Sequence, residues 1–312
     1  MSNPSKLGDR PVRLIAFDLD GTIFGDPHHQ GISPRLEAAF SAAAERGVVL
    51  VAATGRPVWM IGTCLEEAPW MGWAISGNGS SIVPLKGAPA GARVIEQPIP
   101  REQAIEMLDL LSSVGSTINA HMQAKSFVEN WTERPLPDFA AKLADEAAEL
   151  EAAGETPAGP PATGRNPILE MMELGLMDAV DSVADEMRAD PSLRLDKLDV
   201  TYPRTRDFSA VAAAIDAMDG LEIARLGAHD VEITVAGVSK GAALGRLCAE
   251  LGIDEGQAVA FGDSGNDRSM CGRAATFVAM GNATDEIKAA ADEECPSVLR
   301  DGVAVWIEEH VL

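Results

Sequence analysis

The sequence has little that would suit a disulfide framework, a zinc site or a membrane span. It contains four cysteines in 312 residues and no Cys-x-x-Cys pair: Cys64, Cys248, Cys271 and Cys295. This usage is typical of reduced thiols in a cytoplasmic protein. No stretch approaches the ~18 unbroken apolar residues of a transmembrane helix, and the polar residues 1–10 do not resemble a signal peptide.

Positive charge is also scarce: the chain has 25 Lys and Arg residues and 48 Asp and Glu residues, which gives a formal net charge of −23. Nucleic acids and anionic membranes both attract a basic surface, so we expect neither as a partner. If the substrate is an anion, a metal ion or a well-placed lysine has to offset this repulsive field. The sequence carries no signal for an oligomeric state.

What is present is an ordinary globular composition, with 46% hydrophobic and 23% charged residues. A chain of this length predicts two domains more readily than one.

The most informative stretch begins with an apolar strand predicted over residues 14–17. It ends abruptly in Asp18, Asp20, Gly21 and Thr22. In an open α/β sheet, ligands bind at the carboxyl ends of the strands. Because side chains alternate along a strand, both carboxylates would point to the same side. Two like charges this close need a cation between them or a shared proton. Taken alone, however, the pair fits a solvated acidic turn better, and the rest of the chain decides against that interpretation.

A second apolar strand is predicted over residues 48–53, after a helix that begins at Ser33-Pro34 and ends near Gly47. A strand, a helix and a strand in this order form a parallel pair with a right-handed crossover. Thr54 therefore emerges at the same sheet edge as Asp18. A small hydroxyl followed by Gly55 suits close approach to a phosphate oxygen.

The middle of the chain has a different character. It follows a third strand near 73–76 and a turn at 77–79. Its expected elements are helices at 100–114, 136–153, 176–189 and 207–218, and strands near 116–123, 125–131, 168–174, 193–202, 221–226 and 230–235, with a loop at 154–167. This order predicts a self-contained α/β layer inserted into the first domain. We place the catalytic core at 1–84 and 236–312 and the inserted cap at 85–235.

After the insertion, the chain returns to the first domain with a helix that starts at Ser239-Lys240. A lysine in the first turn of a helix opposes the macrodipole by about 0.3–1 kcal/mol, which a paired anion would explain. A buried strand at 258–261 then leads into a glycine-rich loop that carries Asp263, Asn266 and Asp267. Such a loop is typical of a site for a hard cation.

Together, these segments resemble the haloacid dehalogenase superfamily and, within it, the Cof-type (class IIB) phosphatases. The motifs that carry the resemblance are Asp18-Leu19-Asp20-Gly21-Thr22, Thr54-Gly55-Arg56, Ser239-Lys240-Gly241 and Gly262-Asp263-Ser264-Gly265-Asn266-Asp267. They stand in the family's order, and the family's cap is inserted just after Asn78-Gly79. The resemblance implies a Rossmann-like core with a parallel sheet and an inserted α/β cap.

The resemblance also implies roles for individual residues. Asp18 is the nucleophile that forms an aspartyl-phosphate, and Asp20 is the general acid and base. The expected phosphate-binding residues are Thr54, Gly55, Lys240 and Asn266. Mg²⁺ is expected at Asp18, the Asp20 carbonyl and Asp263, with Asp267 orienting those ligands. The cap would read the leaving group, and its first strands offer Glu129, Asn130 and Trp131. Arg56 reaches either a substrate anion or a nearby helix start.

The leading hypothesis is a Mg²⁺-dependent phosphatase for a small phosphorylated metabolite, a sugar or polyol phosphate. A phosphosugar mutase of the same superfamily is the nearest alternative. A non-catalytic phosphometabolite-binding module is a third hypothesis, because fold does not determine function. A purely structural metal protein would need more oxygen ligands than the sequence supplies.

Overall fold

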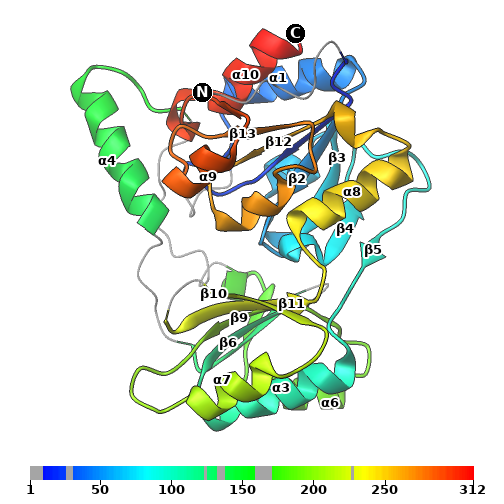
Figure 1. Cartoon of the computed structure of the whole chain (residues 1–312), viewed down its shortest axis with the longest axis vertical. Helices are drawn as coiled ribbons and strands as arrows, with labels where there is room; N and C mark the ends of the chain where they lie inside the picture. The colour runs from blue at the N-terminus through cyan, green and yellow to red at the C-terminus, as the bar shows by residue number, and fades with distance from the viewer. Residues whose placement is uncertain (1–9, 26–30, 123–124, 132–137, 159–170, 226–227) are drawn as a thin grey trace.

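The computed structural model describes residues 10–25, 31–122, 125–131, 138–158, 171–225 and 228–312, apart from the side chains of 138–142. Two β-sheets organise this part of the chain, one in the upper and one in the lower half of Figure 1. The upper sheet is built mainly from the two ends of the chain and the lower sheet from its middle. The predicted α/β architecture with a parallel core sheet is confirmed.

The first sheet has eight strands in the order β14-β13-β12-β1-β2-β3-β4-β5. In chain order they are β1 (Leu14–Phe17), β2 (Val49–Ala53), β3 (Met71–Ser76), β4 (Ser81–Pro84), β5 (Ile95–Glu96), β12 (Ala258–Gly262), β13 (Thr276–Ala279) and β14 (Glu293–Glu294). The strands from β14 to β3 run parallel, whereas β4 and β5 pair antiparallel. Every side chain of β1 is buried, as its apolar run predicts.

Register brings the sequence motifs to one edge of this sheet. Phe17 of β1 lies opposite Ala52 of β2 and Phe261 of β12. The residues that follow these strands therefore emerge side by side, and the Asp18 amide continues the ladder by donating to the Phe261 carbonyl at 3.1 Å. Because the strands are parallel, their carboxyl ends form one rim on which a ligand site can be built.

Helices pack on both faces of the first sheet (Figure 1). They are α1 (Pro34–Glu45), α2 (Thr63–Glu66), α8 (Lys240–Leu251), α9 (Asp285–Ala290) and α10 (Gly302–His310). The start of α1 is as predicted, because Ser33 Oγ accepts from the Leu36 amide at 3.0 Å and Pro34 occupies the first turn. Ser239 caps α8 in the same way, by accepting from the Ala242 amide at 3.1 Å.

The second sheet has six strands in the order β10-β11-β9-β6-β7-β8. They are β6 (Thr117–Met122), β7 (Ser126–Glu129), β8 (Met177–Ala179), β9 (Leu195–Thr201), β10 (Leu221–Arg225) and β11 (Asp230–Val235). Helices α3 (Arg101–Ser113), α6 (Val183–Ala189) and α7 (Ser209–Asp216) cover one face and share an apolar core with it. The other face is turned toward the first sheet (Figure 1).

Two predicted elements of the insertion are wrong in position. The described part of the expected strand at 168–174, residues 171–173, is helical, and the strand lies at 177–179 instead. Gly175 has φ +69° and reverses the chain before that strand. Helix α6 then starts at Val183 rather than 176, because Ser182 Oγ caps it by accepting from the Asp185 amide. Residues 159–167 of the expected loop lie outside the described residues.

Two further elements of the segment 85–235 lie with the first sheet. Strand β5 pairs with β4, so the sheet extends past the predicted boundary at residue 84. Helix α4 (Asp138–Ala152), expected in the cap layer, buries Leu143 and Leu150 in the apolar cluster of the first sheet. Arg300 Nη1 also donates to Glu155, just after α4, at 3.0 Å. The division into core and cap stays a prediction, while β5 and α4 pair and pack with the first sheet.

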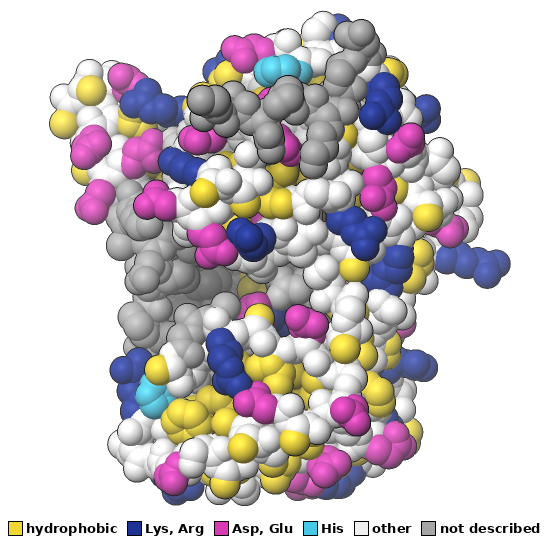
Figure 2. All heavy atoms as spheres, viewed as in Figure 1, with side chains coloured by type: hydrophobic (Ala, Val, Ile, Leu, Met, Phe, Trp, Pro, Cys, Tyr) yellow, Lys and Arg dark blue, Asp and Glu magenta, His cyan; other side chains and the backbone are white. Residues whose placement is uncertain are grey.

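Among the described residues, no helix has the length and apolar composition that crossing a membrane requires. On the face shown in Figure 2, acidic and basic side chains are interspersed, and the basic ones do not gather into a large patch.

The start of α8 is packed against backbone, which makes Gly241 intolerant of a side chain. A Cβ at this position would lie 1.8 Å from the Ser269 carbonyl oxygen. We expect Gly241→Ala to lower the free energy of unfolding by at least about 1–3 kcal/mol, the usual cost of overpacking. Denaturant unfolding followed by circular dichroism measures this change.

Gly245→Ala is the matched control on the same helix. Its Cβ would meet the Oε1 end of the flexible Glu255 side chain, at 2.7 Å, and alanine favours a helix interior by about 1 kcal/mol over glycine. Equal stability of the two variants would contradict the packing described for Gly241.

Candidate active site

The site is centred on a buried ion pair between Asp18, at the end of β1, and Lys240, the first residue of α8. Lys240 Nζ lies 2.7 Å from Asp18 Oδ1, and the lysine is fully buried. The ammonium also donates to Asp267 Oδ1 at 2.6 Å and to Asn266 Oδ1 at 3.2 Å. Burial alone would lower the pKa of Lys240, but Asp18 and Asp267 raise it overall. Lys240 therefore stays charged between two carboxylates.

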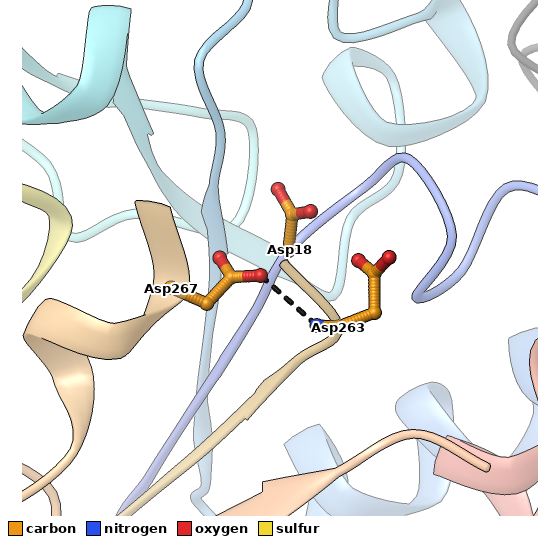
Figure 3. Close-up of side chains that lie close together, drawn as sticks. All are labelled: Asp18, Asp263 and Asp267. Atoms are coloured by element: carbon orange, nitrogen blue, oxygen red, sulfur yellow. Dashed lines mark hydrogen bonds between the residues drawn. The ribbon is translucent and has the colours of Figure 1, made fainter. Parts of the chain in front are cut away.

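Asp267 is held firmly in place by the chain itself. Its Oδ2 accepts from the backbone amides of Asp263 at 3.0 Å and Ser264 at 3.1 Å. A Cβ on Gly262 would lie 2.5 Å from Asp267 Cγ, so the carboxylate packs directly on a glycine. Figure 3 shows Asp267 reaching from the loop after β12 toward the amide of Asp263. Both of its oxygens are thus occupied, which suits an orienting role.

Asp263 completes a buried group of three carboxylates at the rim of the sheet. One oxygen from each of Asp18, Asp263 and Asp267 lies within 4.8 Å of the other two. In Figure 3 the carboxylates of Asp18 and Asp263 point to the same side. Gly21 has φ +81°, and its Cβ would lie 2.5 Å from Asp263 Oδ2, so this turn has room for the carboxylate only because residue 21 is glycine. Carboxylate oxygens in such an arrangement fit a divalent cation.

The electrostatics of this group also favour a bound cation. Burial raises the pKa of Asp18 to about 7, with Asp267 adding to the rise and Lys240 opposing it. Burial raises the pKa of Asp263 to about 9, and the charges of Asp18 and Asp267 contribute further. One lysine is thus too little positive charge for three buried carboxylates, and either protons or a metal ion must supply the rest.

The phosphate-binding candidates lie beside this group. Thr54 is buried, and its Oγ1 accepts from the Arg56 amide at 3.1 Å. A Cβ on Gly55 would lie 3.0 Å from Asn78 Oδ1, 3.4 Å from Lys197 Nζ and 3.6 Å from Asn266 Nδ2. Because residue 55 has no side chain, the Asn78 amide oxygen and two donors, one from the core and one from the second sheet, converge on the small volume above its backbone. An anion fits such a volume.

Asp20 is turned toward Arg56 rather than toward the carboxylate group. Arg56 Nε donates to Asp20 Oδ2 at 2.8 Å, and its Nη2 donates to Asp20 Oδ1. The guanidinium also donates to the Met60 carbonyl at 3.0 Å and lies over the Phe24 ring, 5.4 Å from its centroid. This two-pronged geometry fixes the orientation of the Asp20 carboxylate.

Several residues at the site had no assigned role in the sequence. Asn78 of the predicted turn has φ +57° and accepts from Asn266 Nδ2 at 3.3 Å. Its own amide group donates to Glu232 of β11 at 2.8 Å. Lys197 of β9 donates to the Gly55 carbonyl at 3.3 Å. In the sequence, an asparagine between two glycines was the available signal for Asn78. For Lys197, the only signal was that β9 carries charged residues of both signs, Asp196, Lys197 and Asp199.

The three cap residues proposed from the sequence to contact the leaving group make local contacts in or next to the second sheet. Glu129 is buried and caps α6 by accepting from the Val183 amide at 3.0 Å. Asn130 has φ +52° and donates to the Ser116 carbonyl at 3.1 Å, as a turn residue does. Trp131 packs against a small apolar cluster around Val128. Glu129 and Asn130 thus stabilise the fold locally.

Residues 15–307 match the profile of the haloacid dehalogenase-like hydrolase family. The chain is 28% identical to the phosphatase YwpJ of Bacillus subtilis strain 168, over 96% of this chain and all of the relative. It is 26% identical to the 5-amino-6-(5-phospho-D-ribitylamino)uracil phosphatase YcsE of the same organism, over 97% and 98% of the two chains. An HMP-PP phosphatase of Serratia proteamaculans is 27% identical over 88% of this chain and 86% of the relative.

Solved structures agree on the fold. A haloacid dehalogenase-like hydrolase from B. subtilis superposes with a TM-score of 0.71 at 24% identity, covering 96% of this chain and all of that one. A sugar phosphatase of subclass IIB superposes with a TM-score of 0.66 at 20% identity, over 95% and 98% of the chains. The chain therefore belongs to the haloacid dehalogenase-like hydrolases, as its motifs predict. Within that family it is a phosphoric monoester hydrolase that acts on small phosphorylated substrates.

The raised carboxyl pKa values predict how stability depends on pH. In the folded protein without metal, Asp18 and Asp263 hold protons up to about pH 7 and 9, against 3.8 for the ordinary carboxyl. The folded state then binds more protons than the unfolded state, so stability falls as pH rises, by up to about 1.4 kcal/mol per pH unit per group. In EDTA, we expect the free energy of unfolding to fall between pH 5 and 8.

Asp263→Asn is the matched variant for this measurement, because it removes one raised pKa and keeps the side-chain shape. We expect a shallower dependence on pH in Asp263→Asn than in the unmodified protein, by urea unfolding at each pH. Identical slopes would show that Asp263 does not take up a proton in this range.

Proposed function

We propose that the chain is a Mg²⁺-dependent phosphatase that hydrolyses a sugar or polyol phosphate through an aspartyl-phosphate on Asp18. One observation carries the proposal. The Asp18 carboxylate, at the end of the central strand, lies 2.7 Å from the buried ammonium of Lys240. It also lies in a buried cluster of carboxylates with Asp263 and Asp267. A nucleophilic oxygen, a fixed cation and oxygen ligands for a metal ion thus meet at one point.

The donor set fits Mg²⁺. Asp18 and Asp263 would hold the ion together with the Asp20 carbonyl oxygen, while Asp267 orients the site through Lys240 and the amides of the loop after β12. When bound, the ion would draw the phosphate and the nucleophile together and neutralise their negative charges. The pKa values of Asp18 and Asp263 favour this interpretation, because a divalent cation would replace the protons that these carboxyls otherwise retain.

In the first step, an Asp18 oxygen attacks phosphorus in line, and the bond between phosphorus and the leaving oxygen breaks. Lys240 and Asn266 donate to the non-transferring oxygens, together with the Thr54 hydroxyl and the backbone above Gly55. Phosphoryl transfer depends mostly on such positioning and charge stabilisation. The bond to Asp18 divides a difficult displacement by water into two easier steps.

Asp20 is the proton carrier in both steps. It gives a proton to the leaving oxygen, and then takes one from the water that attacks the aspartyl-phosphate and frees Asp18. Arg56 orients this carboxylate through two parallel hydrogen bonds. The ion pair with Arg56 holds the Asp20 carboxylate away from the carboxylates of Asp18 and Asp263. Catalysis therefore requires Asp20 to break at least one of its hydrogen bonds to Arg56 and to reach the substrate oxygen.

The relatives support a small leaving group that carries hydroxyls. YcsE is named for a phosphate ester of a ribityl chain, and one solved relative of the same fold is a sugar phosphatase. Other relatives act on different phosphates, such as the HMP-PP phosphatase. A polyol or sugar monophosphate is therefore the first substrate class to test.

The deciding experiment measures inorganic phosphate released from p-nitrophenyl phosphate and from a panel of sugar and polyol phosphates, with Mg²⁺ and with EDTA. We expect release that depends on Mg²⁺, needs no bisphosphate activator and falls at least about a thousandfold in Asp18→Asn, since loss of a nucleophile removes the whole covalent route. Phosphate that returns to another position of the substrate would point to a mutase. Activity retained by Asp18→Asn would contradict the proposal.

A further inference from the structure

The face of the second sheet that is turned toward the catalytic rim carries a polar cluster. We call it the polar cap face and define it by five residues on β6, β9 and β11: Asn119, His121, Lys197, Asp199 and Glu232. Pairing explains why they lie together. Lys197 is opposite His121, and Asp199 is opposite both Asn119 and Glu232. Alternation along the strands then places all five on the face away from the helices.

Lys197 is the positive charge of this cluster and is almost completely buried, with 2% of its surface exposed. Its Nζ lies 2.5 Å from Glu232 Oε1 and 2.9 Å from Asp199 Oδ1. These carboxylates keep the pKa of Lys197 raised despite its burial, while Lys197 and His121 lower the pKa of Asp199. His121 Nε2 lies 2.8 Å from Asp199 Oδ2 and Nδ1 lies 2.7 Å from Ser126 Oγ.

Hydrogen bonds connect this cluster to the phosphate-binding candidates. Asn266 donates to Asn78, and Asn78 donates to Glu232, which binds Lys197. Lys197 in turn reaches the Gly55 carbonyl. The polar cap face thus borders the volume above Gly55 in which an anion fits. A group attached to a phosphate in that volume would lie against this face.

Two features indicate that the cluster is built for a ligand rather than for packing. The Lys197 contact with the Gly55 carbonyl is its longest, at 3.3 Å, and is made to a neutral oxygen, so a substrate oxygen can replace it at little cost. Across the strand pair, the buried Asn119 Oδ1 has no hydrogen-bond partner among the described residues. A buried acceptor without a donor costs stability, which a donor on a ligand would recover.

An apolar wall borders the same face. Val128 of β7 lies opposite Asn119, and it forms a cluster with Met171 and Met177 against which Trp59 and Trp131 pack. Trp59 belongs to the short 3-10 helix Val58–Met60 after β2, and Trp131 follows β7, so the wall is shared by the core and the second sheet. A carbon chain bearing hydroxyls matches a polar face next to an apolar wall, because its hydroxyls can bind the polar residues while its carbon atoms pack on the apolar ones.

We propose that the polar cap face binds the leaving group of the substrate through its hydroxyls, with Lys197 donating to a hydroxyl oxygen and Asn119 and Asp199 accepting from hydroxyl hydrogens. This inference rests on the proposed function and assigns its specificity to particular side chains. Glu232 holds the Lys197 ammonium and links it to Asn78, which makes it a positioning residue. A buried ion pair adds little to stability compared with apolar packing, so packing alone does not explain the cluster.

The test compares esters that share the phosphate and differ in hydroxyls. Ribitol 5-phosphate and glucose 6-phosphate are set against pentyl phosphate, and p-nitrophenyl phosphate reports whether the enzyme is active at all. We expect kcat/KM of the unmodified protein to favour at least one polyhydroxylated ester over pentyl phosphate by tenfold or more, since a site built for hydroxyls rejects an analogue that lacks them by about that factor or more.

Lys197→Met removes the donor and keeps the side-chain length. We expect this variant to reduce the preference for the polyhydroxylated ester about tenfold, chiefly through KM, which corresponds to one charge-assisted hydrogen bond. Asn119→Ala, at a half-buried position that carries no ion pair, is the second variant and should reduce the same preference. Lys125→Met is the matched control, because Lys125 pairs with Asp178 at the far edge of the sheet and should leave the preference unchanged.

The outcomes separate this inference from the proposed function. If no ester releases phosphate, p-nitrophenyl phosphate included, the phosphatase proposal fails, and the assignment of a leaving-group site fails with it. If p-nitrophenyl phosphate is hydrolysed but neither polyhydroxylated ester is preferred to pentyl phosphate, the inference alone is overturned. It is also overturned if Asn119→Ala and a folded Lys197→Met slow every ester equally. Should Lys197→Met fail to fold, the Asn119→Ala result decides.

Discussion

The site depends on the burial of one ammonium, that of Lys240, between two carboxylates on different segments. Asp18 belongs to the central strand and Asp267 to the loop after its neighbour, so the lysine at the start of α8 ties three distant parts of the chain together. A fully buried lysine is tolerated only with such partners. The same contact holds the Asp18 carboxylate still at the rim where a phosphate is expected.

This arrangement leaves an excess of negative charge, which gives the site its chemistry. Asp263 joins Asp18 and Asp267 within a buried volume that holds one lysine, and the carboxyl pKa values rise accordingly. A bound metal ion would relieve this repulsion and would at the same time bind the substrate. The acidic composition of the chain, with a formal net charge of −23, makes such local cations all the more necessary for an anionic substrate.

Much of the core could be predicted because its signals are local. Each of three elements is defined by a few adjacent residues and could therefore be predicted: the apolar run before Asp18, the Ser33-Pro34 helix start and the loop of Asp263. The hydrogen bonds between side chains of the site could not be predicted, because they join residues far apart in sequence. Arg56 binds Asp20 across 36 positions and Lys197 reaches Gly55 across 142. The position of α4 was missed for the same reason, since its amphipathic pattern does not say which sheet its apolar side will meet.

The covalent bond between Asp18 and phosphorus is the central step of the proposed mechanism. The decisive measurement is mass spectrometry of Asp20→Asn protein, quenched in acid within milliseconds to seconds of mixing with p-nitrophenyl phosphate and Mg²⁺. Because this variant lacks the carboxylate proposed to activate water, we expect a phosphate adduct that is sensitive to hydroxylamine and maps to the peptide containing Asp18. An adduct on another residue, or turnover by Asp20→Asn as fast as that of the unmodified protein, would contradict the account.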